Sequence, residues 1–194
     1  MGAVALIFLM GAYFGAHFLL PGRKNSMQKH TRFLVHAAII AALYAVLTHF
    51  QNILLPGSAT WAIQLRMSEA LCILAFFTPA AAFGLSVGCL IFNLTFAPAL
   101  PLDFAVGSLA TYLAAKSMWL MRNVTFRKIP FPGLLMPALF NALLVGWELQ
   151  VYIGGGFWIN ALYVAIGEAI VLLTAGTLLY CAMKKRNLDA KIFE

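Results

Sequence analysis

Apolar runs long enough to cross a lipid bilayer recur along this chain and leave little length for a soluble domain. A membrane-spanning helix needs about 20 mostly apolar residues. The chain is 63% hydrophobic and only 10% charged, a composition typical of integral membrane proteins. We therefore predict an all-α polytopic membrane protein. The predicted spans, each bounded by proline, glycine or charge, are 33–50, 64–78, 80–97, 103–121, 132–151 and 157–183.

The stretch 62–97 could form one long helix or a hairpin of two. As a single helix it would reach about 54 Å, nearly twice the roughly 30 Å thickness of the hydrocarbon core. A hairpin turning near Thr78 and Pro79 also places all basic clusters on one side, which the positive-inside bias favours. Both ends of a six-helix core are then cytoplasmic. The clusters are Arg23, Lys24, Lys29 and Arg32; Arg122, Arg127 and Lys128; and Lys184, Lys185, Arg186 and Lys191.

The first 26 residues form an apolar extension ahead of the predicted six-helix membrane domain, residues 27–194. The apolar run at 3–20 favours an extra N-terminal helix. A signal-like segment and a translated leader ahead of Met27 are the alternatives, although the run lacks a basic start and a clear cleavage site.

Four acidic residues fall within or at the ends of the predicted spans, and the orientation places all four in the outer half of the membrane. An ionisable group at the centre of a lipid-facing helix costs at least about 2.5 kcal/mol, so such groups usually face the bundle interior and mark a ligand or ion path. We predict an outward-opening polar pocket. Its candidate substrate-binding residues are Gln64, Arg66, Glu69, Asn93, Asp103, Asn141, Trp147, Glu148, Trp158 and Glu168.

Structural roles compete with ligand binding for several of these residues. Arg66 and Glu69, three residues apart, could simply pair with each other. Asp103 opens a predicted helix, where a carboxylate is a good N-cap. Asn93 and Asn141 could hydrogen-bond neighbouring helices. The outer tryptophans could form an interfacial aromatic belt instead of a stacking surface.

Four carboxylates against one arginine make an acceptor-rich site, suited to a cation or to a ligand with many donors. A guanine-like edge, with adjacent N–H donors, is a natural bidentate partner for a glutamate. The sequence predicts no metal site, because hard cations need clustered oxygen ligands at short spacing. The cysteines, Cys72, Cys89 and Cys181, lie apart in apolar runs and are predicted to be small buried hydrophobic residues.

The chain carries no nucleotide-binding glycine-rich loop and no nucleophile placed beside a base, so we predict a transport component with no cofactor, not an enzyme. Energy must then come from an ion gradient or from another protein. In the first span Ala37, Ala41 and Ala45 recur every four residues, a small-residue face that lets another helix approach closely. This face could dock a partner protein or pack inside the same bundle.

Three stretches of the sequence resemble the QueT family, substrate-binding S components of energy-coupling-factor transporters. They are IQLRMSEALCILAFFTPAAAFGLSVGCLIFNL, LDFAVGSLAT at 102–111 and NALLVGWEL at 141–149. Within them, Q-x-R-x-S-E-A-L, F-F-T-P-A-A, G-x-x-x-G-C-L-I-x-N-L and G-S-L-A-T follow the family's order. The resemblance covers residues 33–183.

The resemblance implies a six-helix S component in the bacterial plasma membrane, with both ends cytoplasmic. It implies a partner module of two ATPase subunits and a transmembrane coupling subunit, which the alanine face of the first span would contact. The implied substrate is a queuosine precursor, 7-aminomethyl-7-deazaguanine. Alternatives are another vitamin-like compound such as cobalamin, and a self-sufficient cation-coupled carrier.

Overall fold

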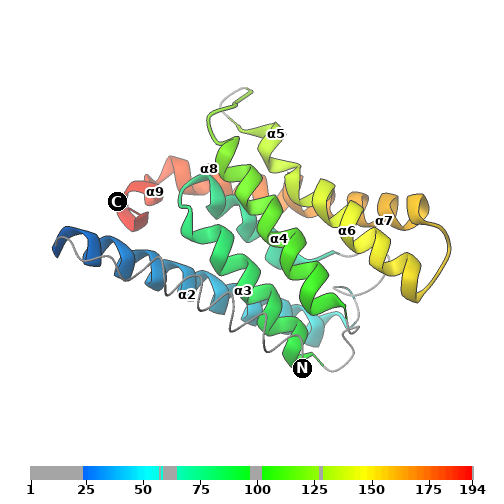
Figure 1. Cartoon of the computed structure of the whole chain (residues 1–194). Coiled ribbons are helices and arrows are strands. Elements are labelled where there is room, and N and C mark those ends of the chain that lie inside the picture. Colours follow the sequence, from blue (N-terminus) through cyan, green and yellow to red (C-terminus); the bar gives the residue numbers. More distant parts are fainter. Residues whose placement is uncertain (1–23, 57, 59–64, 97–101, 127–128, 194) are drawn as a thin grey trace. The chain divides into compact units, whose positions relative to one another are not determined.

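The computed structural model describes residues 24–56, 58, 65–96, 102–126 and 129–193 (Figure 1). The chain divides into two compact units, Met1–Arg32 and Phe33–Glu194. The second unit is called the bundle below. The predicted N-terminal helix at 3–20 and the candidate residue Gln64 lie outside the described residues.

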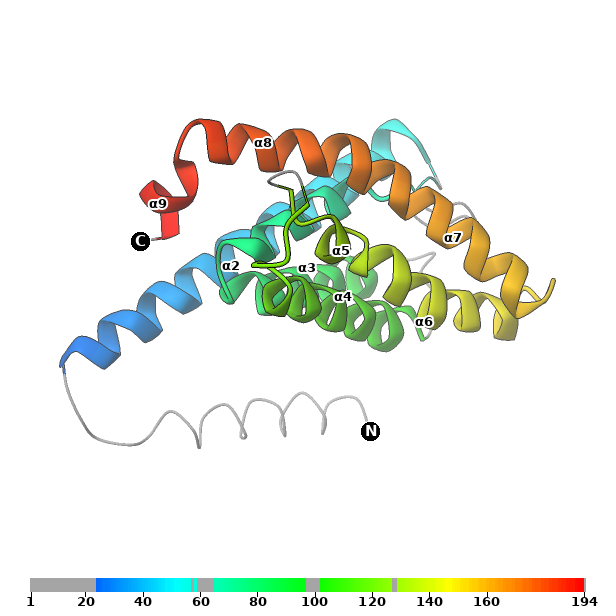
Figure 2. The ribbon, with the colours of Figure 1, turned by 90° about the horizontal axis from the view of Figure 1, so that it is seen from above.

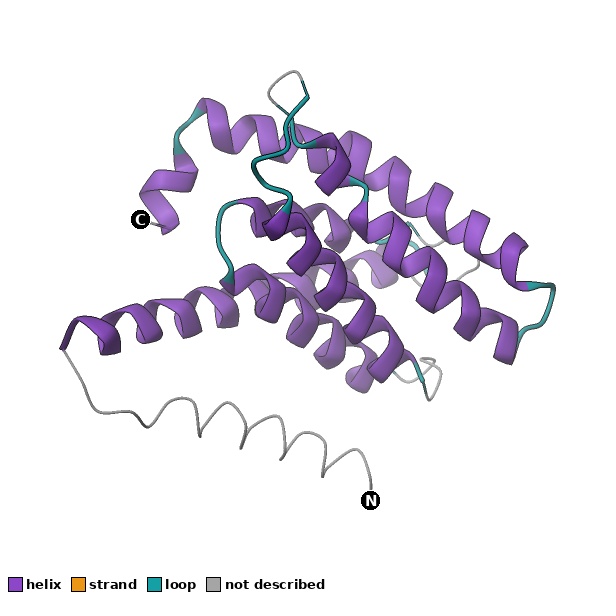
Figure 3. Ribbon diagram, turned by 45° about the horizontal axis from the view of Figure 1, so that its top comes forward, coloured by secondary structure: helices purple, strands orange, loops and turns teal. Residues whose placement is uncertain are grey.

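Helices joined by short loops make up the described part of the chain, as predicted (Figure 3). The regular elements are α2 (Lys24–Leu54), the 3₁₀ helix η1 (Met67–Phe76), α3 (Ala80–Thr95), α4 (Asp103–Leu120), α5 (Phe131–Leu134), α6 (Met136–Tyr152), α7 (Phe157–Val171), the π-helical turn η2 (Leu172–Gly176), α8 (Thr177–Lys185) and α9 (Leu188–Phe193). Figure 2 shows α7 and α8 running on as one continuous helix.

Three stretches of the described helices are long and apolar enough to cross a membrane: Met27–Leu54, Phe131–Tyr152 and Phe157–Lys185. Met67–Phe76 and Ala80–Thr95 are shorter apolar helices. The helices follow the predicted segments closely, while six membrane crossings remain a prediction. Within the bundle α3 packs on α4, α4 on α6, and α6 on α7, and η1 contacts α3, α4, α7 and α8 between them (Figure 1).

The hairpin predicted within 62–97 is confirmed. The 3₁₀ helix η1 ends at Phe76 and α3 begins at Ala80. The hydroxyl of Thr78 accepts a hydrogen bond of 3.3 Å from the backbone N–H of Ala80, which helps to start α3 after Pro79. A single long helix over this stretch is therefore excluded.

Two glycines of α3 allow α2 to approach it closely. A Cβ atom added at Gly84 would lie 2.6 Å from the carbonyl oxygen of Ala37, and one at Gly88 would lie 2.7 Å from that of Ala41. Ala41 and Ala45 are accordingly buried. The alanine face predicted to dock a partner is thus occupied by α3 of the same chain, because glycine opposite alanine lets two helix backbones meet.

This packing changes what a bulky residue at Ala41 should do. Ala41→Leu is expected to force α2 away from α3 and to destabilise the bundle by about 1 to 3 kcal/mol. Ala42→Leu, on the exposed side of the same helix turn, is the matched control and should have little effect. Thermal unfolding of the two purified variants in detergent checks this; equal midpoints would show that the Ala41 face is not packed inside the bundle.

The bundle is apolar outside and carries charges inside, the reverse of a soluble protein. Leu43, Val46 and Ile53 of α2 are at least half exposed, as are Ile159 and Leu162 of α7. The long apolar helices and this exterior point to a membrane protein. One prediction about the interior is wrong: Cys72 and Cys89 are buried, whereas Cys181 is exposed because it lies on the outer side of α8.

Candidate functional site

Seven of the ten predicted substrate-binding residues are buried inside the bundle, each less than 10% exposed. They come from the start of η1, from α3, α4, α6 and α7, and they are connected by the hydrogen bonds and electrostatic contacts described below. This group is called the acidic cluster: Arg66, Glu69, Asn93, Asp103, Asn141, Glu148 and Glu168.

The 3₁₀ geometry of η1 sets the first wall of the acidic cluster. A 3₁₀ helix has three residues per turn, so side chains at i and i+3 are eclipsed. Arg66 directly precedes η1, and Glu69 and Cys72 follow it at intervals of three. Glu69 and Cys72 therefore point the same way, and the Cys72 thiol donates a 3.0 Å hydrogen bond to Glu69 Oε2.

Glu69 is held by protein donors on both of its carboxylate oxygens. The Tyr44 hydroxyl of α2 donates a 2.5 Å hydrogen bond to Oε1, and the Cys72 thiol occupies Oε2. Glu69 and Tyr44 are both fully buried. Glu69 thus ties η1 to α2, a structural role that leaves it less capacity to accept donors from a ligand.

Arg66 is the one buried cation among the residues that the structure describes. Its Nη1 lies 3.9 Å from Cys89 Sγ and would lie 4.0 Å from a Cβ added at Gly107 of α4, so this glycine leaves room for the guanidinium. The charge of Arg66 acts on Glu69 and Glu168, and also on Glu148. The contacts with Cys89 and Gly107 place Nη1 of Arg66 beside α3 and α4.

Glu168 on α7 keeps one open acceptor. Asn141 Nδ2 of α6 donates a 3.1 Å hydrogen bond to Glu168 Oε1. Glu168 Oε2 is buried and receives no hydrogen bond from the described residues. The Asn141–Glu168 hydrogen bond thus joins α6 to α7, while Glu168 Oε2 stays available as an acceptor. Hydrogen bonding between helices therefore accounts for only one of the two carboxylate oxygens of Glu168.

Glu148 is the most open acceptor of the cluster. Both of its carboxylate oxygens are buried, and no donor from the described part of the chain reaches either. Its acidic neighbour is Asp103 of α4. Asp103 is itself fixed at its backbone, because Asn93 Nδ2 donates a 2.7 Å hydrogen bond to its carbonyl oxygen.

Buried carboxylate oxygens without donors are costly, since burying a polar group without a hydrogen bond costs about 1 to 3 kcal/mol in proteins. Glu148 and Glu168 together leave three such oxygens. A ligand that brings N–H donors or a positive charge would satisfy them. The arrangement therefore fits binding of a donor-rich or cationic molecule.

Two of the predicted residues lie outside the acidic cluster. Trp147 and Trp158 are 49% and 78% exposed and lie on the outside of the bundle. Their role as a stacking surface stays a prediction, and an interfacial position, which Trp commonly takes in membrane proteins, fits their exposure. Gln64 falls outside the described residues.

The sequence prediction missed the polar face of α2. Tyr44, Thr48 and Gln51 recur at helical spacing and are all buried. Thr48 donates a 2.7 Å hydrogen bond to Ser68 of η1, and Gln51 Oε1 accepts one of 2.7 Å from the Met67 backbone N–H. This face positions the start of η1. In the sequence, the indication of this buried polar face was that polar side chains recur at helical spacing inside an otherwise apolar segment.

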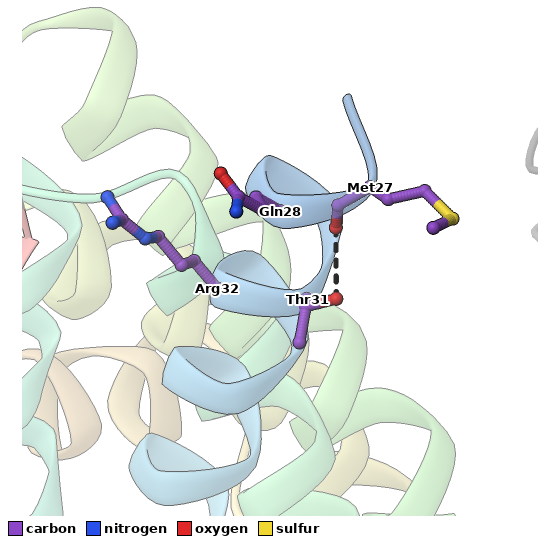
Figure 4. Close-up of a pocket in the computed structure, with 4 residues that line it drawn as sticks. All are labelled: Met27, Gln28, Thr31 and Arg32. Carbon is purple, nitrogen blue, oxygen red and sulfur yellow. Dashed lines mark hydrogen bonds between the residues drawn. The ribbon is translucent and has the colours of Figure 1, made fainter. Parts of the chain in front are cut away.

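A pocket in the first unit is not the candidate site. Met27, Gln28, Thr31 and Arg32 line it, and none of them carries a carboxylate (Figure 4). Thr31 Oγ1 donates a 2.9 Å hydrogen bond to the backbone carbonyl of Met27 one turn earlier. Figure 4 shows the Arg32 and Met27 side chains pointing in opposite directions, so the four residues do not converge on a ligand.

Comparison with known families gives one match. A family model described as the QueT transporter matches residues 34–185, more than half of the chain. The chain belongs to the QueT transporter family. No curated protein and no solved structure matches the chain significantly.

Membership of the QueT transporter family agrees with the fold and with the composition of the buried site. The matched residues include all seven members of the acidic cluster and all three long apolar stretches in whole or in large part. The protein is therefore a membrane protein of a transporter family. A small-molecule substrate is consistent with buried acceptors that lack donors of their own.

Proposed function

We propose that this protein is the substrate-binding S component of an energy-coupling-factor transporter, and that it takes up the queuosine precursor 7-aminomethyl-7-deazaguanine. It would lie in the bacterial plasma membrane with both ends of the bundle cytoplasmic. The observation that carries the proposal is the acidic cluster with its three buried carboxylate oxygens that lack hydrogen-bond donors. The proposed substrate brings N–H donors and a primary ammonium to such a site.

The roles of the cluster residues follow from their contacts. Glu148 and Glu168 accept donors from the ligand, because they carry the open oxygens. Arg66 balances part of the negative charge, and its N–H groups can contact a ligand carbonyl. Glu69 holds η1 against α2 through Tyr44 and contributes to the ligand only through its charge.

A coupling partner would supply the energy for transport. We propose a module of two ATPase subunits and a transmembrane coupling subunit. Since α3 covers Ala41 and Ala45, docking must use another side of α2, and Ala38 and Ala42 are exposed there. Small residues on that side would let a partner helix approach closely.

Direct binding tests the proposed substrate. Purified protein in detergent is expected to bind 7-aminomethyl-7-deazaguanine tightly, guanine more weakly and cobalamin not at all, as measured by isothermal titration calorimetry. The guanine control tests recognition of the ring edge, and cobalamin tests the alternative vitamin. Tight binding of cobalamin, or no binding of the deazapurine, would remove the substrate proposal.

A self-sufficient cation-coupled carrier is the second candidate, and the intramembrane carboxylates favour it. Uptake in cells that lack every energy-coupling-factor subunit separates the two functions. An S component should not support uptake in such cells. Uptake that persists there and stops when a protonophore is added would establish the carrier.

A further inference from the structure

We propose that the acidic cluster contains two subsites for opposite ends of one planar ligand. Asp103 and Glu148 form an outer subsite for an alkylammonium group. Asn141 and Glu168 form an inner subsite for the N–H and carbonyl edge of a heterocycle. This inference rests on the proposed function and assigns the parts of the ligand to particular residues.

The outer subsite is a pair of buried carboxyl groups. Asp103 and Glu148 are both less than 10% exposed and interact with each other. Two carboxyl groups that share a buried site repel each other when both are ionised. Neither oxygen of Glu148 has a donor from a described residue. A cation with several N–H donors relieves the repulsion and fills the open acceptors in one step, which an uncharged group cannot do.

The inner subsite combines an amide with a carboxylate. Asn141 uses one N–H on Glu168 Oε1, and its amide group carries a second N–H. Glu168 Oε2 remains an open acceptor. A donor beside an acceptor complements the edge of a guanine-like ring, where a carbonyl group adjoins an N–H group.

The spacing of the subsites defines the ligand's length. Asn141 and Glu148 are seven residues apart on α6. This is close to two turns, so they lie on one face of the helix and are separated by about 10 Å along its axis. Glu148 lies one turn from the end of α6 at Tyr152, whereas Glu168 lies about 16 Å along α7 from its start at Phe157. The heterocycle therefore enters first and the ammonium group stays nearer the loops.

A matrix of two glutamate variants and two probes tests this assignment. The probes are 7-aminomethyl-7-deazaguanine and 7-deazaguanine, which lacks the ammonium arm. Wild type is expected to prefer the ammonium-bearing probe by about 10-fold or more, since a hydrogen bond to a charged group contributes about 1.5 to 3 kcal/mol. Glu148→Gln should remove this preference, because it should weaken binding of the ammonium-bearing probe by about 10-fold more than binding of 7-deazaguanine. Glu168→Gln should lower the affinity for both probes by a similar factor.

The ratio of the affinities for the two probes, called the preference ratio, does not depend on how much of a variant is folded, because both probes are measured on the same preparation. Gln150→Ala, on the exposed side of α6, is the control and should keep the wild-type ratio. Equal weakening of both probes by Glu148→Gln, or a lost preference in Glu168→Gln, would overturn the two-subsite assignment alone. Wild type that binds neither probe would overturn the proposed substrate and the assignment together.

Discussion

Replacing Arg66 with methionine is expected to lower the free energy of unfolding by about 3 to 5 kcal/mol and to abolish ligand binding. Arg66, Glu69, Glu148 and Glu168 are all buried. The charge of Arg66 acts on these three carboxyl groups. Removing the one buried cation among the described residues leaves these carboxyl groups without an opposite charge. Methionine keeps much of the volume of the side chain, so the loss reports charge and hydrogen bonding rather than an empty space.

Two control variants separate the role of the charge from its position. Arg66→Lys keeps the charge but loses the planar fork of donors, so it should recover part of the stability and less of the binding. Arg186→Met removes an exposed cation after α8 and should leave the unfolding midpoint unchanged. Thermal unfolding in detergent and calorimetric titration supply the two readouts. An Arg66→Met protein as stable as wild type would show that the carboxyl groups need no cation.

The helical segments could be predicted from the sequence because each membrane helix leaves a long apolar run. Charge distribution also favoured a hairpin over a single helix. The predicted turn near Thr78 and Pro79 lies between η1 and α3, as the structure confirms. The 3₁₀ form of η1 could not be predicted in this way. Its apolar residues fit an ordinary helix as well, and only tertiary contacts fix the tighter turn that aligns Glu69 and Cys72.

The burial of the candidate residues was predicted best where burying the side chain costs the most free energy. Ionised groups in apolar segments must face inward, and Glu148 and Glu168 are buried as this argument requires. A tryptophan side chain that faces outward at a membrane interface has no comparable free-energy cost. Its position in the sequence therefore does not predict whether it faces the bundle interior or the exterior. Trp158 is largely exposed for that reason. Tyr44 was missed because an apolar side chain with one hydroxyl group resembles ordinary core residues.

The second large effect is expected at Gly146 of α6, where the fold and the acidic cluster depend on the same contact. A Cβ added there would lie 2.8 Å from Ala161 Cα of α7. Gly146→Leu should push the two helices apart, cost about 1 to 3 kcal/mol and break the 3.1 Å hydrogen bond from Asn141 to Glu168. Asn141 and Glu168 then no longer lie together to contact the ligand. The expected fall in ligand affinity is at least about 10-fold, which is the cost of one hydrogen bond between the ligand and a charged group.

Gly176→Ala is the matched control for Gly146→Leu, because a Cβ at Gly176 would lie 3.4 Å from Ile73, an ordinary contact. It should keep both stability and affinity. Gly146→Ala should fall between wild type and Gly146→Leu, because its single methyl group already meets the Ala161 backbone. Affinity that falls in step with stability across this series would link the α6 and α7 contact to the inner subsite. Unchanged affinity in a destabilised Gly146→Leu protein would show that the ligand does not depend on the spacing of these helices.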